Sequence, residues 1–173
     1  MTLPNALTAA RALLVIPVIG LIAIGDVSFA LLVFVAAAAT DALDGPLARR
    51  RGPTALGASL DPLADKILVV GTLAALAVQG TAPAWTVILI VARELVAIQI
   101  RARAPHALGA SSDGKAKTVL QVGAIAALLA AGAWPETGLA AAANALLVAA
   151  TALTVLSGVR LVLRAKQTTA DPA

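Results

Sequence analysis

Residues 40–66 read TDALDGPLARRRGPTALGASLDPLADK, and this stretch decides how the rest of the chain is interpreted. It contains four aspartates, namely Asp41, Asp44, Asp61 and Asp65, although the flanking segments are almost entirely Ala, Leu, Val and Ile. A carboxylate inside a membrane-length segment costs roughly 2.5–3.5 kcal/mol on insertion scales. Four carboxylates therefore need compensation, and a divalent cation held by oxygen ligands is the simplest one. We expect the chemistry of the protein here.

The composition is that of an integral membrane protein. Of the 173 residues, 60% are hydrophobic and only 13% are charged, and the mean hydropathy is +0.94. A soluble domain is nearer one half apolar and one quarter charged. The chain has no cysteine, which excludes disulfides, thiolate metal sites and cysteine nucleophiles, and its single histidine, His106, cannot build a multi-histidine zinc site. We expect one domain over residues 1–173 and no cleavable signal peptide.

Six apolar segments are long enough for membrane helices, which need about 20 residues to cross a bilayer. The candidates are residues 5–24, 28–48, 57–79, 83–103, 116–133 and 138–163. Turn-forming residues, mainly glycine, proline and aspartate, mark the breaks between them. Segment 57–79 is the least apolar, because two aspartates, a proline and a lysine fall in its first turns. The fold class that we predict is an all-α integral membrane protein with six transmembrane helices.

The thirteen Lys and Arg residues are distributed asymmetrically. Runs such as Arg49–Arg51 follow segments that would end on one side, whereas the turns on the other side carry only Asp26 and Glu136 as charges. The positive-inside rule then places both termini in the cytosol and the four aspartates near the cytosolic face of the cell membrane. Topology and anionic lipid also explain the pI near 10.4, so we expect no nucleic-acid partner.

The spacing of the acidic residues suits a pair of neighbouring helices. Asp41 and Asp44 are three residues apart, and Asp61 and Asp65 are four apart. On a helix, both spacings place a pair on one face, so two adjacent helices can direct two carboxylates each at a common point. Because the ligands are all oxygens, magnesium or manganese is the expected ion.

Small residues and one arginine frame these acids. Gly45 directly follows Asp44, and Gly57 lies one turn before the second acidic pair. Glycine within a helix costs about 1 kcal/mol relative to alanine, so it usually serves close approach, either of another helix or of a ligand's ring or phosphate. Arg49 is the nearest fixed cation, and its planar guanidinium suits a phosphate.

The full pattern is Asp41-x-x-Asp44-Gly45-x-x-Ala48-Arg49, then seven residues, then Gly57-x-x-x-Asp61-x-x-x-Asp65. It resembles the motif of the CDP-alcohol phosphotransferase family, also called the CDP-alcohol phosphatidyltransferases, at all eight fixed positions. Six membrane helices also fit that family, so the resemblance covers most of the chain.

This resemblance implies a function and a set of roles. Members of the family transfer a phosphatidyl-type group from a CDP-linked lipid to an alcohol and release CMP. Two divalent ions, Mg²⁺ or Mn²⁺, would be held by the four aspartates, and Asp65 would also be the catalytic base on the acceptor hydroxyl. The CDP-lipid would be bound by Gly45, Ala48, Arg49 and Gly57. Similar proteins are often homodimers.

Further segments indicate the acceptor. Residues 3–11, LPNALTAAR, resemble the PNxLTxxR opening of bacterial phosphatidylglycerophosphate synthases and of related cardiolipin synthases. Arg93-Glu94 and residues 114–121, GKAKTVLQ, resemble the RE and GKxKTxxQ segments of the phosphatidylglycerophosphate synthases. The acceptor that this implies is sn-glycerol 3-phosphate, with its phosphate bound by Arg93, Lys115 and Lys117.

Other interpretations stay open at this point. Arg93 can instead form a structural ion pair between helices, and topology alone accounts for Lys115 and Lys117. Within the family, the acceptor can be phosphatidylglycerol, as in a cardiolipin synthase, or an inositol phosphate or serine. A divalent-cation transporter is the alternative from another class, but its carboxylates should line a route to both faces, whereas these four are predicted at one face.

Overall fold

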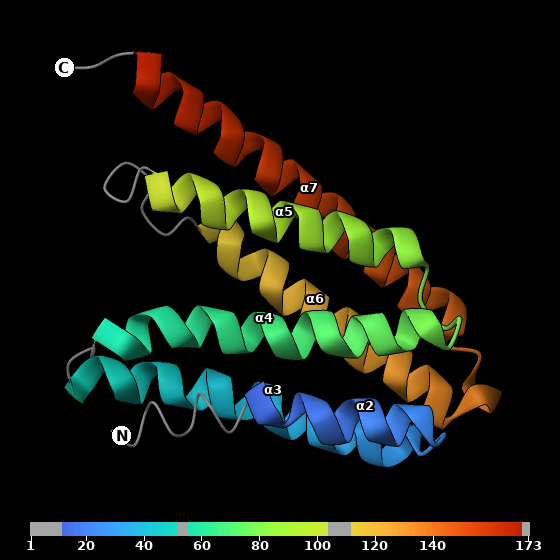
Figure 1. Cartoon of the computed structure of the whole chain (residues 1–173). Helices are drawn as coiled ribbons and strands as arrows, with labels where there is room; N and C mark the ends of the chain where they lie inside the picture. Colours follow the sequence, from blue (N-terminus) through green and yellow to red (C-terminus); the bar gives the residue numbers. More distant parts are fainter. Residues whose placement is uncertain (1–11, 52–54, 104–111, 171–173) are drawn as a thin grey trace.

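The computed structural model is a bundle of α-helices (Figure 1). It describes the backbone of residues 12–51, 55–103 and 112–170, and the side chains of residues 12–40, 66–100 and 117–167. The helices are α2 (Val15–Ala23), α3 (Val27–Arg51), α4 (Ala55–Val78), α5 (Ala84–Arg103), α6 (Ser112–Ala133) and α7 (Ala140–Ala170), with a 3-10 turn, η1 (Pro135–Thr137), before α7. The prediction of an all-α fold is confirmed for these residues.

The helix limits follow the turn chemistry of the sequence. Gly25 and Gly80 adopt φ values of +83° and +74°, which L side chains rarely adopt, and they end α2 and α4 respectively. Asp26 then begins α3, since its Oδ1 accepts a hydrogen bond from the backbone N–H of Phe29 at 3.3 Å. The predicted segments agree with α3 to α6 within a few residues, whereas α7 extends to residue 170 instead of 163. Of the predicted first segment, residues 5–11 lie outside the described residues.

Each helix reverses the direction of the one before it, and α6 lies near the middle of the bundle (Figure 1). Helix α6 contacts α3, α4 and α7, while α2 packs on α3 and α4, and α5 packs on α4 and α7. The C-terminal ends of α3, α5 and α7 therefore share one end of the bundle with the N-terminal ends of α4 and α6. We call this the basic end, because Arg49–Arg51 and Arg101 belong to it.

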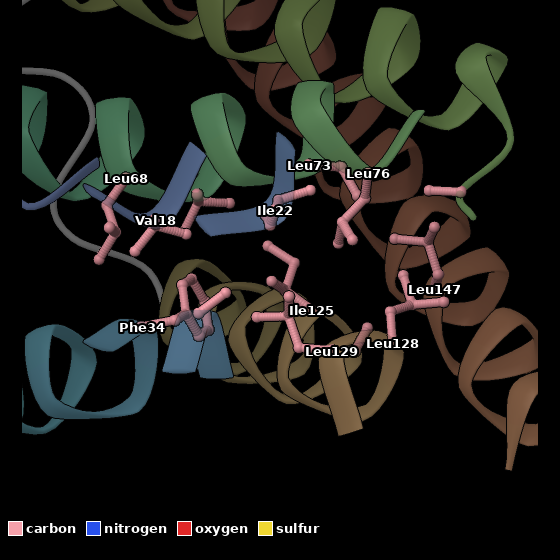
Figure 2. Close-up of a cluster of buried hydrophobic side chains, with 14 of the residues drawn as sticks. Val18, Ile22, Phe34, Leu68, Leu73, Leu76, Ile125, Leu128, Leu129 and Leu147 are labelled. Atoms are coloured by element: carbon pink, nitrogen blue, oxygen red, sulfur yellow. The ribbon is translucent and has the colours of Figure 1, made fainter. Parts of the chain in front are cut away.

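The apolar core has members in all six helices, α2 to α7, and Figure 2 shows a part of it. Phe34 of α3 is fully buried against residues of α2, α4 and α6, and Leu147 extends the core to α7. Its largest fully buried aliphatic side chains are Leu68, Leu73, Ile90, Ile125, Leu128, Leu129 and Leu147. The surface is apolar too, with Ile16, Leu32, Ile88 and Val119 each more than 60% exposed.

Among the described residues, one helical stretch, Ala140–Gln167, is long and apolar enough by itself to cross a membrane. Shorter apolar stretches occur at Val27–Thr40, Lys66–Val78 and Lys117–Ala133. These shorter stretches end at Thr40 and begin at Lys66 and Lys117, which are also the limits of the residues whose side chains the structure describes. The prediction of six spans with cytosolic termini therefore stays a prediction.

Gly71 allows α2 and α4 to approach each other closely. A Cβ atom added at this glycine would lie 2.5 Å from Cγ2 of Val15, which real Cβ atoms essentially never do. Valine has a stiff χ1 torsion in a helix, so this methyl group has little freedom to move away. A hydrogen bond of 3.2 Å from Nε2 of Gln79 to the carbonyl of Ile22 ties the same two helices together at their far ends.

We predict that Gly71→Ala lowers the thermal midpoint of the detergent-solubilised protein. Overpacking typically costs roughly 1–3 kcal/mol, and the better helix propensity of alanine offsets only about 1 kcal/mol of this. Gly123→Ala is the matched control, because a Cβ there meets nothing within 4 Å. A Val15→Ala change should restore much of the loss in the double variant, as a double-mutant cycle would measure. Equal midpoints for the two alanine variants would contradict this close approach.

Candidate active site

Four charged side chains meet inside the bundle, and we call them the cation cluster: Lys66 of α4, Arg93 and Glu94 of α5, and Lys117 of α6. The side chains of Arg93, Glu94 and Lys117 are at most 10% exposed, and that of Lys66 is 21% exposed. Charged groups are rarely buried in this way unless they are paired. The cluster is therefore a feature that the fold specifically accommodates.

Glu94 is the centre of this cluster. Its Oε2 accepts a hydrogen bond from Nζ of Lys66. Its Oε1 accepts one from Nη1 of Arg93 at 2.9 Å and another from Nζ of Lys117. One carboxylate thus pairs with cations carried by three consecutive helices, α4, α5 and α6.

Helix α7 shapes the surroundings of Arg93. Nη2 of Arg93 donates a hydrogen bond to Oγ of Ser157 at 3.1 Å. The aliphatic part of Arg93 lies against Gly158, where an added Cβ would stand 2.8 Å from Cγ of the arginine. The Nε of Arg93 is buried and has no acceptor within the described part of the chain. Arg93 is therefore held firmly while retaining an unused donor.

A second polar contact continues the cluster between α6 and α7. Nε2 of Gln121, one turn after Lys117, donates to Oγ1 of Thr154 at 2.8 Å, and that hydroxyl in turn donates to the carbonyl of Ala150. Gln121 and Thr154 are both buried. A polar strip therefore runs through the interior beside the apolar core.

The cluster carries an excess of positive charge. Three cations surround one carboxylate, which leaves two positive charges unbalanced within this group. Buried like charges repel strongly where the effective dielectric constant is low. A group with this charge balance and an unused guanidinium donor is suited to a dianion such as a phosphate monoester.

The acidic residues lie on two antiparallel neighbouring helices. Asp41 lies ten residues before the end of α3, and Asp65 lies ten residues after the start of α4. Asp44 and Asp61 are seven and six residues from the same two ends. Only residues 52–54 separate the helices, so Asp44 and Asp61 lie at a similar depth, about 10 Å from these helix ends at 1.5 Å per residue. Asp41 and Asp65 lie deeper, at about 15 Å. Lys66 directly follows Asp65, so the cation cluster begins at the depth of these two deeper aspartates.

Residues 1–156 match the family of the CDP-alcohol phosphatidyltransferases. The chain belongs to this family. The phosphatidyltransferase motif predicted from residues 41–65 therefore falls on α3 and α4, on either side of the connection between them.

Three relatives are similar to this chain in sequence. A probable phosphatidylglycerophosphate synthase of Mycobacterium tuberculosis is 39% identical over 137 residues, which is 77% of this chain and 64% of the relative. A CDP-diacylglycerol–glycerol-3-phosphate 3-phosphatidyltransferase of Bacillus subtilis is 37% identical over 147 residues, covering 73% of this chain and 76% of the relative. A probable CMP-forming cardiolipin synthase of Drosophila melanogaster is 38% identical over 98 residues, covering 55% and 30%. The chain thus spans just under two thirds of the mycobacterial relative's length.

Most of the predicted site residues of this chain have side chains outside the described set. They are Asp41, Asp44, Gly45, Ala48 and Arg49 on α3, Gly57, Asp61 and Asp65 on α4, and Lys115 on α6. Within the side chains that are described, no three His, Cys, Asp or Glu residues gather into a metal-binding group. The helical spacing of the aspartates, the matching depths and the all-oxygen donor set fit a divalent ion.

The structure brings two predicted residues, Arg93 and Lys117, together on Glu94. It also brings Lys66, Ser157 and Gly158 to the site. The sequence pattern predicts no site role for these three residues. Spacing cannot reveal them, because they meet Glu94 and Arg93 only through the packing of α4, α5 and α7.

Proposed function

We propose that this phosphatidyltransferase transfers the phosphatidyl group of CDP-diacylglycerol to sn-glycerol 3-phosphate, giving phosphatidylglycerophosphate and CMP. The names of the Mycobacterium and Bacillus relatives support this activity. The single structural observation that carries it is the cation cluster, which lies beside the acid-bearing part of α4. The chain would then act in phospholipid biosynthesis.

The charge of the cluster favours glycerol 3-phosphate as the acceptor. A phosphate monoester carries close to two negative charges at pH 7, which matches the two unbalanced positive charges around Glu94. Arg93 and Lys117, together with Lys115, would bind that phosphate through charge-assisted hydrogen bonds. The unused Nε donor of Arg93 supports this assignment.

The donor and the metal would occupy the neighbouring part of the site. Asp41, Asp44, Asp61 and Asp65 would hold two divalent ions, Mg²⁺ or Mn²⁺, and Gly45, Ala48, Arg49 and Gly57 would surround the CDP group. Bound there, the ions would supply positive charge that stabilises the entering hydroxyl oxygen and the leaving phosphate oxygen. The acyl chains of the donor can remain in lipid while the nucleotide faces water.

The reaction that we propose is a single displacement at phosphorus. The free primary hydroxyl of glycerol 3-phosphate loses its proton to the Asp65 carboxylate, and its oxygen forms a bond to the lipid-linked phosphorus. The bond from that phosphorus to the oxygen bridging to CMP breaks, and CMP leaves with the electron pair. Such a transfer requires positioning and charge stabilisation more than covalent participation by the protein.

We further propose six membrane spans, with both termini and the active site on the cytosolic side of the cell membrane. The exposed apolar side chains, together with the burial of the charged cluster inside the bundle, support this placement. Trp85 and Trp134 are both exposed and lie at the opposite end of the bundle from the basic end, as expected for aromatic residues at a membrane interface. A homodimer is part of the proposal on the family resemblance alone.

A cardiolipin synthase is the second candidate, supported by the similarity to the Drosophila protein. Its acceptor, phosphatidylglycerol, carries a phosphodiester with one negative charge, which matches the cluster less well than a dianion. None of the three relatives described above is named for an inositol phosphate or serine acceptor. Membership of a phosphatidyltransferase family also favours a transferase over a divalent-cation transporter.

The first prediction from the proposed function concerns the acceptor. Purified protein with CDP-diacylglycerol and magnesium should release CMP when glycerol 3-phosphate is added, and release should stop when the metal is chelated. Phosphatidylglycerol, inositol phosphate and serine should give little product in the same assay. Faster CMP release with phosphatidylglycerol than with glycerol 3-phosphate would favour the cardiolipin synthase instead.

The second prediction concerns the aspartates. Asp61→Asn and Asp65→Asn should each lower CMP release at least roughly a hundredfold, because each removes a proposed metal ligand and the second also removes the base. The thermal midpoint should change little. Asp26→Asn is the matched control, since asparagine caps a helix as well as aspartate does and this residue lies at the opposite end. Near-normal turnover by both site variants would refute these roles.

The third prediction concerns the support of Arg93. Gly158→Ala should displace the arginine and raise the KM for glycerol 3-phosphate several-fold, while leaving the KM for CDP-diacylglycerol unchanged. Gly123→Ala again serves as the control with open space at its Cβ. If both variants keep the wild-type KM for glycerol 3-phosphate, Arg93 does not bind the acceptor as proposed.

A further inference from the structure

We propose that Glu94 is the positioning residue of the acceptor site, and that it acts by holding Lys66, Arg93 and Lys117 in one fixed arrangement. This inference rests on the proposed function, because it assigns the cluster to the phosphate of glycerol 3-phosphate. It adds a role for a carboxylate that cannot itself bind an anion. Glu94 would therefore act entirely through the cations that it holds.

The hydrogen bonds support an organising role. Oε1 of Glu94 accepts hydrogen bonds from both Arg93 and Lys117, so a guanidinium and an ammonium group share one oxygen atom. Without the carboxylate, these two cations would repel each other and move apart. Lysine side chains have several rotatable bonds, so fixing one requires a specific partner. Glu94 supplies that partner for two lysines at once.

Oε2 extends the arrangement towards the proposed metal site. It accepts from Lys66, the residue directly after Asp65 on α4. The same carboxylate therefore links the residues proposed for the acceptor phosphate to the helix that carries the proposed base. This link would set the distance between the acceptor's phosphate and the group that takes the proton from its hydroxyl, and displacement reactions are sensitive to such distances.

Two explanations of Glu94 predict opposite effects. If it only reduces the positive charge of the cluster, its neutralisation would strengthen the attraction for an anion and lower the KM for glycerol 3-phosphate. If it positions the cations, its neutralisation would raise that KM, because the amide of glutamine cannot accept hydrogen bonds at both of its ends. The sign of the change thus separates the two roles.

The experiment compares Glu94→Gln with the full-length wild-type protein, using CMP release. We expect the KM for glycerol 3-phosphate to rise roughly tenfold or more, the size of effect that one lost charge-assisted hydrogen bond produces. The KM for CDP-diacylglycerol should stay within about twofold, because the donor occupies the other part of the site. Glu136→Gln, at an exposed glutamate in η1, is the matched control and should leave both constants unchanged.

Glu94→Asp covers the case in which the glutamine variant does not fold. Aspartate keeps the charge but is shorter by one methylene group, so it cannot reach all three cations, and the KM for glycerol 3-phosphate should again rise. A lowered or unchanged KM for glycerol 3-phosphate in a folded variant overturns the inference. A variant whose only change is a lower kcat, in proportion to the fraction of protein that is folded, overturns it as well. The proposed function fails separately, if the wild-type protein releases no CMP with glycerol 3-phosphate.

Discussion

The ionic contact of Glu94 with three cations is the constraint on which the charged part of this bundle depends. It joins α4, α5 and α6, and Arg93 extends it to Ser157 of α7. Replacing a buried ion pair by apolar residues is often neutral or stabilising, so such a cluster is weak evidence for stability. Its presence in an otherwise apolar interior therefore supports the proposal that the cluster binds a charged ligand.

The acidic and basic parts of the interior complement each other. The acidic motif occupies the C-terminal half of α3 and the N-terminal half of α4. Lys66, the first cation of the cluster, directly follows Asp65 on α4. A nucleotide-linked lipid and a phosphorylated alcohol are both anionic, so a site for both needs cations in two places. Metal ions held by the aspartates would supply them for the donor, and the protein's own side chains would supply them for the acceptor.

Much of the fold could be predicted from the sequence, because its breaks carry unambiguous turn chemistry. Gly25 with Asp26 and Gly80 before Pro83 mark helix ends that the structure places within a residue or two. The acidic motif could be found because its residues are close in sequence and share helix faces. Glu94 could be noticed only as the neighbour of Arg93, since its partners lie 23 and 28 residues away. Helical periodicity does not say which helices become neighbours, so the cluster required the structure.

The apolar core explains how such a charged site can be held in place. Phe34, Leu128 and Leu147 pack α3, α6 and α7 together without polar atoms (Figure 2). Close contacts at Gly71 and Gly132 bring α2 and α3 against their neighbours. These contacts restrict the relative movement of the helices, and a transfer reaction needs its charged groups held to within about 0.5 Å. The cations around Glu94 belong to helices that this core already fixes. Binding of an anionic substrate would therefore cost little conformational entropy of the backbone.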